Sequence, residues 1–240
     1  MGKLTEKEKQ NALNEVRILA SIQHPNIISY KESFLEERSA TLCIVMEYAD
    51  GGDLLQRITH ARSGKQPKIP EQTVWSYWIQ MLHGLQALHD RQIVHRDIKC
   101  ANLFLTKDGV IKLGDLNVSK VAKRGLLQTQ TGTPYYASPE VWQDKPYDHK
   151  SDLWSMGCVL YEMCALQPPF RANDMNQLFK RVCEGRIPGM PAMYSKDLMY
   201  MVKLCLQVDP KLRPLCSDLL QRQQLVRNTP SKLSLQLDGQ

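Results

Sequence analysis

The sequence predicts an α+β fold in which a mostly helical large lobe follows a small lobe of one helix and two strands. Residues 5–22 place apolar side chains at helical spacing along one face. Residues 41–47 form a continuous apolar run, which is typical of a buried strand. From Pro70 onward the periodicity is mostly helical. We therefore divide the chain into a small lobe (1–48), a large lobe (49–227) and a polar tail (228–240).

Length and composition are those of a globular protein. The chain has 240 residues, of which 42% are hydrophobic and 23% are charged, so it can bury a core as one domain or as two small lobes. Its net charge of +6 is spread along the sequence, and the densest basic run, Lys120–Arg124, contains no aromatic residue. Nucleic-acid binding is therefore not indicated.

Cysteine usage and hydropathy bear on the cellular compartment. The seven cysteines are scattered and include no C-x-x-C pair, which favours reduced thiols in the cytoplasm or nucleus over a disulfide framework or a zinc site. No run of 18 apolar residues occurs, and the N-terminal segment lacks the hydrophobic stretch of a signal peptide. We expect a cytoplasmic protein that has no membrane partner.

The first predicted helix carries an acid on its apolar face. Thr5 and Glu8 form a possible capping box at its start. Glu15 lies one turn before Leu19 and two turns before Ile22, so its carboxylate is expected to be buried and to need a partner. The alternative is a residue at the rim of the apolar stripe that pairs with an arginine or with water.

A turn and a long helix follow the second predicted strand. The sequence Asp-Gly-Gly-Asp at 50–53 is typical of a turn that leads into a helix. Residues 72–90 predict a long helix with an apolar and aromatic stripe that packs on the core. His83 and His89 belong to this helix, and we expect surface or capping residues, because two lone histidines without acid or cysteine partners make a poor metal site.

The residues that carry chemistry flank a predicted hairpin. Leu103–Leu105 and Val110–Leu113 each predict a short strand, and Thr106–Gly109 predicts the turn between them. A hairpin returns its second strand to where the first began, so Asn102 and Asp115 are expected to lie side by side. An amide oxygen and a carboxylate in this position suit Mg²⁺, with room left for water and phosphate.

The pattern H-R-D-I-K-C-A-N at 95–102, followed by Asp115, resembles the catalytic and metal-binding core of eukaryotic protein kinases of the serine/threonine type. The resemblance implies that Asp97 receives the proton of the substrate hydroxyl and that Lys99 steadies the transferred phosphoryl group of ATP. It also implies that Asn102 and Asp115 hold Mg²⁺.

The same resemblance assigns nucleotide contacts to the segment around residue 48. Met46 would lie at the back of the adenine pocket, and Glu47 and Ala49 would offer backbone groups to adenine. Asp53 would lie near the ribose or the substrate. In kinases the acid at the position of Glu15 pairs with a lysine on the third strand, which positions the ATP phosphates.

Residues 118–140 resemble a kinase activation segment. The form G-T-P-x-Y-x-S-P-E at 132–140 is similar to that of the NIMA-related serine/threonine kinases. The resemblance implies that Thr133 contacts the catalytic Asp97 and Lys99.

The activation segment also contains candidate regulatory residues. Thr129 would be the first phosphorylation site and Thr131 the second, since both precede Thr133 in an exposed loop. Phosphate there would add about −1.5 to −2 charges, with which Arg96 could pair.

Two features depart from the kinase family. Asp115-Leu116-Asn117 stands where D-F-G is usual, and asparagine is, after glycine, the residue best able to adopt left-handed backbone conformations. Neither the G-x-G-x-x-G loop nor the strand-3 lysine occurs upstream of the first helix. We therefore expect a truncated small lobe, either as a fragment or as a natural protein without the usual nucleotide lid. An apolar patch would then be left at Ala12, Val16 and Leu19 and at Leu42–Ile44.

Two structural roles are expected in the large lobe. Residues 152–163 predict an apolar helix that forms the buried axis of this lobe and ends before Pro168-Pro169-Phe170. Asp152 near its start can accept backbone amides of the catalytic loop. Arg213 stands where kinases pair an arginine with the acid of S-P-E, which is Glu140 here.

We expect a serine/threonine kinase domain that transfers the γ-phosphoryl group of ATP to proteins, although these 240 residues alone would be weakly active or inactive. Protein substrates and an upstream activating kinase are the expected partners, and the resemblance extends the localisation to the cytoskeleton or cilium. The main alternative is a pseudokinase-like interaction protein. A third, a metal phosphohydrolase built on Asp97, Asn102 and Asp115, leaves the activation segment unexplained.

Overall fold

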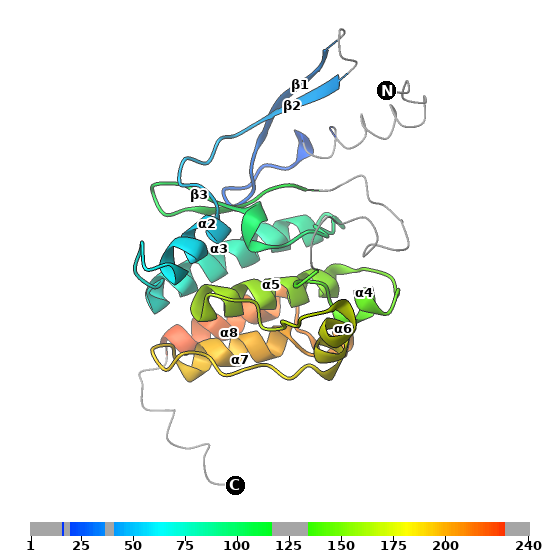
Figure 1. Cartoon of the computed structure of the whole chain (residues 1–240). Helices are drawn as coiled ribbons and strands as arrows, with labels where there is room; N and C mark the ends of the chain where they lie inside the picture. The colour runs from blue at the N-terminus through cyan, green and yellow to red at the C-terminus, as the bar shows by residue number, and fades with distance from the viewer. Residues whose placement is uncertain (1–15, 17–19, 37–40, 117–133, 229–240) are drawn as a thin grey trace.

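The computed structural model describes Val16 and residues 20–36, 41–116 and 134–228 (Figure 1). Two strands form a ribbon at one end of the molecule, and a helical body carries a second two-stranded sheet where it faces the ribbon. The helices are α2 (Leu54–Arg62), α3 (Glu71–His89), α4 (Pro139–Trp142), α5 (His149–Ala165), α6 (Met175–Glu184), α7 (Lys196–Cys205) and α8 (Cys216–Asn228), with 3₁₀ turns η1 (Cys100–Asn102) and η3 (Pro210–Leu212). The predicted α+β class, with most helices in the large lobe, is confirmed.

The ribbon consists of β1 (Tyr30–Glu36) and β2 (Thr41–Met46), which pair antiparallel. The prediction that residues 41–47 form a buried strand is wrong: Val45 is 36% exposed and Met46 is 46% exposed, beside an exposed Phe34 on β1. Among the described residues this sheet has only these two strands, so its apolar side chains remain in contact with solvent. The apolar patch is not found where it was expected, because Val16 is buried and Leu42–Ile44 are half-buried, while Ala12 and Leu19 lie outside the described residues. The exposed apolar side chains of the ribbon are instead Phe34, Val45 and Met46.

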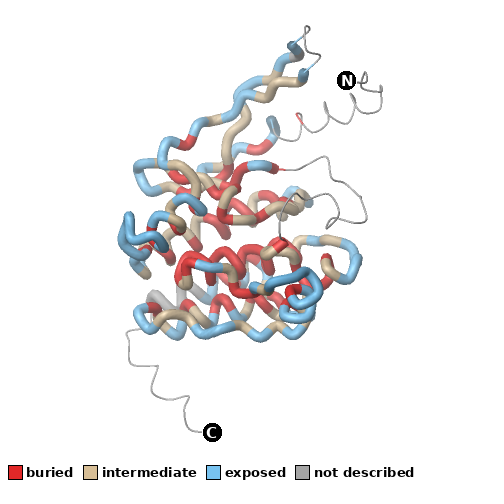
Figure 2. The backbone as a smooth tube through the Cα atoms, viewed as in Figure 1, coloured by how far each residue is buried: buried red, intermediate tan, exposed pale blue. Residues whose placement is uncertain are grey.

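Helix α5 is the buried axis of the helical body. Every residue from Ser151 to Cys164 is buried, as a helix that is surrounded on all sides requires. The helix begins at His149, one turn before the predicted start, because Asp148 accepts hydrogen bonds from the amides of Lys150 and Ser151 and caps it. Figure 2 shows this burial along the centre of the body, and α3 and α7 pack against α5.

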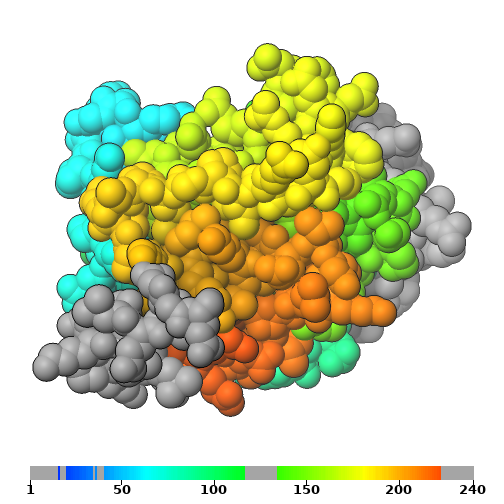
Figure 3. All heavy atoms as spheres, turned by 90° about the horizontal axis from the view of Figure 1, so that it is seen from below, coloured from blue at the N-terminus to red at the C-terminus, as the bar shows by residue number. Residues whose placement is uncertain are grey.

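The face opposite the ribbon is built by the C-terminal helices. Seen from below, segments of α6, α7 and α8 follow one another across the surface (Figure 3). Helix α8 packs on α3, so the last described helix is fastened to the core. None of the described helices combines the length and the apolar character needed to cross a bilayer.

Helix α3 packs against both the core helix α5 and the second sheet. It spans Glu71–His89, close to the predicted 72–90, and buries Val74, Trp78, Leu82, Leu85 and Leu88, whereas Trp75 and Ile79 are only partly buried. At Gly84 an added Cβ would lie 2.3 Å from Leu113 Cδ1 and 2.7 Å from the carbonyl oxygen of Asn26. The absence of a side chain therefore allows α3 to approach the sheet closely.

The second sheet is the predicted hairpin. Strands β3 (Leu103–Leu105) and β4 (Ile111–Leu113) pair antiparallel, with Leu103 opposite Leu113. Asn26 supports it from outside, because its Nδ2 donates to the Ile111 carbonyl at 3.0 Å and to Gln80 Oε1 at 3.1 Å. The hairpin that carries the site residues is thus held by both the helical body and the segment before β1.

The pair Arg213–Glu140 fastens η3 to the start of α4. Arg213 is 1% exposed, and its Nη1 and Nη2 donate to the two carboxylate oxygens of Glu140 at 2.6 and 2.7 Å. Burial alone would raise the pKa of Glu140, but the hydrogen bonds and charge of Arg213 outweigh it and lower the pKa. The predicted pairing is confirmed.

Replacing Glu140 with alanine is expected to lower the free energy of unfolding by about 3–5 kcal/mol, because Arg213 would remain buried without its counter-charge. Urea denaturation of the two proteins measures the difference. The exposed pair Lys107–Asp50 provides the control, since Lys107→Ala is expected to change stability far less. Equal losses for the two variants would contradict this assignment.

Candidate active site

The hairpin brings Asn102 and Asp115 together as predicted. Asn102 Nδ2 lies 3.3 Å from Asp115 Oδ2 and 3.1 Å from Asp97 Oδ2, and it also donates to the backbone carbonyl of Asp97 at 2.9 Å. Because Asp97 engages the amide nitrogen, the amide oxygen of Asn102 is the atom that can serve as a cation ligand. Three side chains of the expected site therefore meet at one point.

Lys99 completes the cluster. Its Nζ lies 2.9 Å from Asp97 Oδ2, with the lysine side chain 35% exposed and the aspartate side chain 11% exposed. The ammonium group thus lies beside the carboxylate that is expected to receive a proton, and it remains accessible to an anionic substrate group.

Two residues of the site have left-handed backbone conformations. The φ angle is 69° at Arg96 and 53° at Asp115. Such angles are uncommon for residues other than glycine and persist where the surroundings enforce them. Their position on either side of the Asn102 amide indicates that the backbone is shaped to orient the site.

Asp152 enforces the conformation at Arg96. Its carboxylate accepts the amides of His95 at 2.9 Å and Arg96 at 3.0 Å, and the residue is fully buried. Tyr147 donates its hydroxyl to the same carboxylate at 2.7 Å. Burial alone would raise the pKa of Asp152, but the hydrogen bond and charge of His89 outweigh it and lower the pKa. The predicted role of Asp152 is confirmed.

The expectation for His89 is wrong. Its side chain is 12% exposed, its Nε2 lies 2.9 Å from Asp152 Oδ2, and its Nδ1 lies 3.9 Å from Cys216 Sγ. The acid, Asp152, lies in α5, 63 positions after His89, and the thiol, Cys216, lies in α8, 127 positions after His89. No local pattern in α3 therefore reveals these two partners. His83, in contrast, is exposed as expected.

His95 is buried beneath the site and is not suited to be a base. Burial lowers its pKa, and the nearby carboxylates of Asp152, Asp97 and Asp115 offset this only in part. This agrees with the structural role that we expected from the resemblance.

The proposed nucleotide contacts lie between β2 and α2. The Glu47 carboxylate pairs with Lys112 Nζ at 2.6 Å, and its backbone amide donates to the Ser29 carbonyl. Burial acts to raise the pKa of Glu47, but Lys112 and the Ser29 amide lower it. Ala49 is buried, whereas Met46 is 46% exposed. Lys112 belongs to β4, so this ion pair joins the segment to the hairpin that carries Asp115.

Asp53 caps a helix in this structure. Its Oδ1 accepts the Gln56 amide at 2.8 Å at the start of α2, as the turn sequence predicts. Contact with a ribose or a substrate stays a prediction.

One part of the site was not predicted. Glu162 on α5 is 3% exposed, and its Oε2 accepts hydrogen bonds from Tyr136 at 2.6 Å and from Cys100 Sγ at 3.4 Å. Burial raises the pKa of Glu162. Cys100 lies two residues before Asn102, so this acid joins the candidate metal site to Tyr136, which lies in the predicted activation segment. The signal in the sequence that could have indicated this contact is the single acid, Glu162, within the apolar run of α5.

Several predicted residues lie outside the described part of the chain: Glu15, Asn117, Thr129, Thr131 and Thr133. Arg96, the expected partner of a phosphate, is half-buried. The lobe boundaries also stay predictions.

The donor set fits a hard cation with few protein ligands. No cluster of three or more His, Cys, Asp or Glu side chains in the described ranges is arranged to hold a metal ion. Asn102 and Asp115 supply an amide oxygen and a carboxylate, which suits Mg²⁺ because Mg²⁺ keeps several waters and binds through substrate phosphates.

Comparison with known proteins gives consistent matches. A family model described as protein kinase domain matches residues 2–225. Mouse serine/threonine-protein kinase Nek3 is 43% identical over 237 residues (98% of this chain, 45% of the relative), and mouse Nek5 is 43% identical over 219 residues (90% and 34%). The probable serine/threonine-protein kinase nek2 of Dictyostelium discoideum is 42% identical over 221 residues (90% and 53%). This chain spans less than two thirds of the length of each of these relatives.

Replacing Asp115 with asparagine is expected to weaken Mn²⁺ binding at least about 10-fold, because the only carboxylate of the pair is lost. Water-proton relaxation with Mn²⁺ as the probe measures the affinity. Asp144→Asn is the matched control, since Asp144 is exposed and has a φ of 58° that asparagine tolerates. Unchanged Mn²⁺ affinity in the Asp115 variant would place the cation elsewhere.

Proposed function

The chain belongs to the protein kinase family, and we propose that it is a serine/threonine kinase catalytic domain of the NIMA-related type, which transfers the γ-phosphoryl group of ATP to serine or threonine hydroxyls of proteins. This proposal is based on one observation. The side chain of Asn102 contacts those of Asp97 and Asp115, and Lys99 pairs with the Asp97 carboxylate.

The arrangement suits phosphoryl transfer, which depends mainly on positioning and charge stabilisation. Asp97 is held by the Asn102 amide and by Lys99, so its carboxylate is oriented to receive the substrate hydroxyl proton. Lys99 is partly exposed and can stabilise charge on the transferred group. Mg²⁺, when bound at Asn102 and Asp115, would neutralise phosphate oxygens.

A second candidate function is a pseudokinase-like interaction protein. The observation that favours it is the exposure of Met46, which was expected at the back of the adenine pocket. The 240 residues by themselves contain neither a G-x-G-x-x-G loop nor a strand-3 lysine. Loss of one preorganised stabilising group typically costs a factor of about 10²–10³ in rate. We therefore propose that these 240 residues alone transfer phosphate slowly or not at all.

Partners and location follow from the proposed activity. We propose protein substrates, and an upstream kinase that phosphorylates Thr129 or Thr131 and so creates a partner for Arg96. Free thiols at all seven cysteines support a reducing compartment. A cytoplasmic location, at the cytoskeleton or cilium, is the proposal that the family likeness suggests.

Replacing Asp97 with asparagine is expected to lower kcat for a serine/threonine peptide by about 10²–10⁴, because the proton acceptor is lost. Transfer of labelled phosphate from ATP is measured for the 240-residue chain. It is also measured for a fusion that adds a kinase glycine loop and strand-3 lysine ahead of Met1.

The controls separate the two functions. Mn²⁺ affinity of the Asp97 variant is expected to stay within about threefold of wild type, since Asn102 and Asp115 remain. A wild-type fusion that binds Mg·ATP yet transfers no phosphate would favour the interaction protein, and an Asp97 variant as fast as wild type would refute the role of Asp97.

A further inference from the structure

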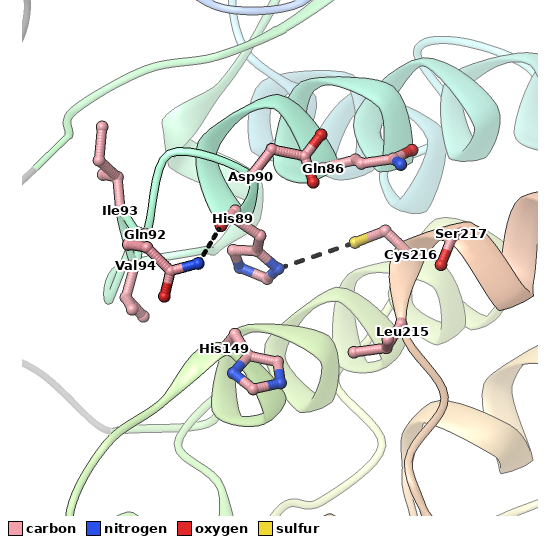
Figure 4. Close-up of a pocket in the computed structure, with 10 residues that line it drawn as sticks. All are labelled: Gln86, His89, Asp90, Gln92, Ile93, Val94, His149, Leu215, Cys216 and Ser217. Carbon is pink, nitrogen blue, oxygen red and sulfur yellow. Dashed lines mark hydrogen bonds between the residues drawn. The ribbon is translucent and has the colours of Figure 1, made fainter.

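The catalytic loop and the nucleotide segment, residues 46–53, are supported by different parts of the molecule. Behind the loop, a cavity of about 420 Å³ lies where the ends of α3, α5 and α8 meet, and His89 and Cys216 face each other inside it (Figure 4). Residues 92–94, which lead into His95, form one wall of this cavity. None of its lining residues belongs to the nucleotide segment, so that segment is fixed from another side.

The Glu47 carboxylate joins two separate parts of the chain. Its Oε1 lies 2.6 Å from Lys112 Nζ on β4, and its Oε2 accepts the Ser29 amide at 3.1 Å. The Glu47 amide donates in turn to the Ser29 carbonyl at 2.8 Å. The side chains of Glu47 and Lys112 are 25% and 12% exposed. Both carboxylate oxygens are therefore used, in a place that solvent reaches only in part.

These contacts close a ring with the backbone of β4. The Leu113 amide donates to the Asn26 carbonyl at 2.9 Å, and the Ile28 amide donates to the Leu113 carbonyl at 2.8 Å. Ser29 follows Ile28 directly, and Lys112 precedes Leu113 directly. Of the contacts in this ring, only the ion pair joins two side chains, so it is the one that a side-chain substitution can open.

The ion pair is charged at neutral pH. Burial alone would raise the pKa of Glu47, but the hydrogen bonds from Lys112 and Ser29 outweigh it and lower the pKa. Hydrogen bonds between charged groups are short and hold their partners in a defined geometry. A pair that solvent reaches adds little to the free energy of unfolding. Its effect is therefore expected in local geometry and not in global stability.

The pair stands between the two halves of the proposed nucleotide site. Lys112 lies three residues before Asp115, in the strand that leads to that carboxylate. Glu47 lies two residues before the buried Ala49, and since its amide is engaged, its carbonyl is the backbone group that can face adenine. A nucleotide with its metal ion must contact both halves at once, and a misplacement of about 1 Å can cost a factor of about 10² in rate.

We propose that Lys112 is a positioning residue for the metal-bound nucleotide, because its ion pair with Glu47 sets the distance between the nucleotide segment and the Asn102–Asp115 pair. The inference rests on the proposed function, since it concerns the same nucleotide site. Lys112 acts through Glu47 and through β4, and no contact between Lys112 and the nucleotide is required.

Three ligands separate the halves of the site in the 240-residue chain. Adenosine reports on the nucleotide segment, Mn²⁺ alone reports on the Asn102–Asp115 pair, and Mn·ADP spans both. Lys112→Met removes the charge but keeps an unbranched side chain that covers the same surface, so the variant is expected to fold. It is expected to bind Mn·ADP about 10-fold more weakly, and adenosine and Mn²⁺ each within about threefold of wild type. Water-proton relaxation measures the two manganese affinities, and NMR titration measures that of adenosine.

Three further variants serve as rescue and controls. Lys112→Arg keeps the charge and is expected to restore Mn·ADP binding to within about threefold of wild type. Glu47→Gln keeps an acceptor for the Ser29 amide and is expected to match Lys112→Met, with the double variant no weaker than either. Lys107→Met removes the same charge from the same hairpin, but Lys107 is 76% exposed and lies 3.6 Å from Asp50, so wild-type binding is expected.

The outcomes distinguish this inference from the proposed function. Wild-type Mn·ADP affinity in Lys112→Met would overturn the role of Lys112, and so would an equal loss in Lys107→Met. A similar loss for all three ligands would indicate a merely structural role and would also overturn it. If the wild-type chain bound neither adenosine nor Mn·ADP, the proposed nucleotide site itself would be refuted, and this inference with it.

Discussion

A single buried carboxylate, Asp152, holds the active site of this protein together. Its two oxygens accept two backbone amides of the catalytic loop and contact His89 and Tyr147. An isolated ionised carboxylate would be very costly in this position, and four polar partners offset that cost. Because two of the partners are consecutive amides, the carboxylate also fixes the left-handed turn at Arg96 and, through it, the place of Asp97.

Two further supports hold the catalytic loop and the hairpin that follows it. Glu162 holds Cys100 and Tyr136 from below, and Lys112 joins β4 to Glu47 from the side of the ribbon. Asp152 and Glu162 both belong to α5 and Lys112 belongs to β4, so the candidate site is supported by two different elements. Such support is what charge stabilisation without reorganisation requires.

The sequence predicted the parts of the site that follow from short-range geometry. The spacing of strand and turn residues predicts a hairpin, and a hairpin places Asn102 beside Asp115. Asp152 and the pair Arg213–Glu140 were predictable because their motifs occupy known places in the family resemblance. Local pattern and motif were sufficient for these contacts.

Contacts between distant segments escaped prediction where no family motif marks them. His89 looked solitary in α3 because its acid and its thiol come from two other helices. The apolar run of β2 indicated burial, yet burial depends on what packs against a strand and not on the strand itself. The exposure of Val45 and Met46 shows that an apolar sequence pattern alone does not predict whether a strand is buried.

The contact of α3 with the hairpin at Gly84 carries a consequence for substitution. An added methyl group would meet the Leu113 side chain and the backbone oxygen of Asn26. That oxygen accepts a hydrogen bond from the Leu113 amide, so it cannot move without breaking this bond or shifting the strand. Alanine is the mildest substitution in most helices. At Gly84, however, its methyl group would push the sheet of β3 and β4 away from α3. The position of the Asn102–Asp115 pair therefore depends on the absence of a side chain at Gly84, where α3 packs on the hairpin.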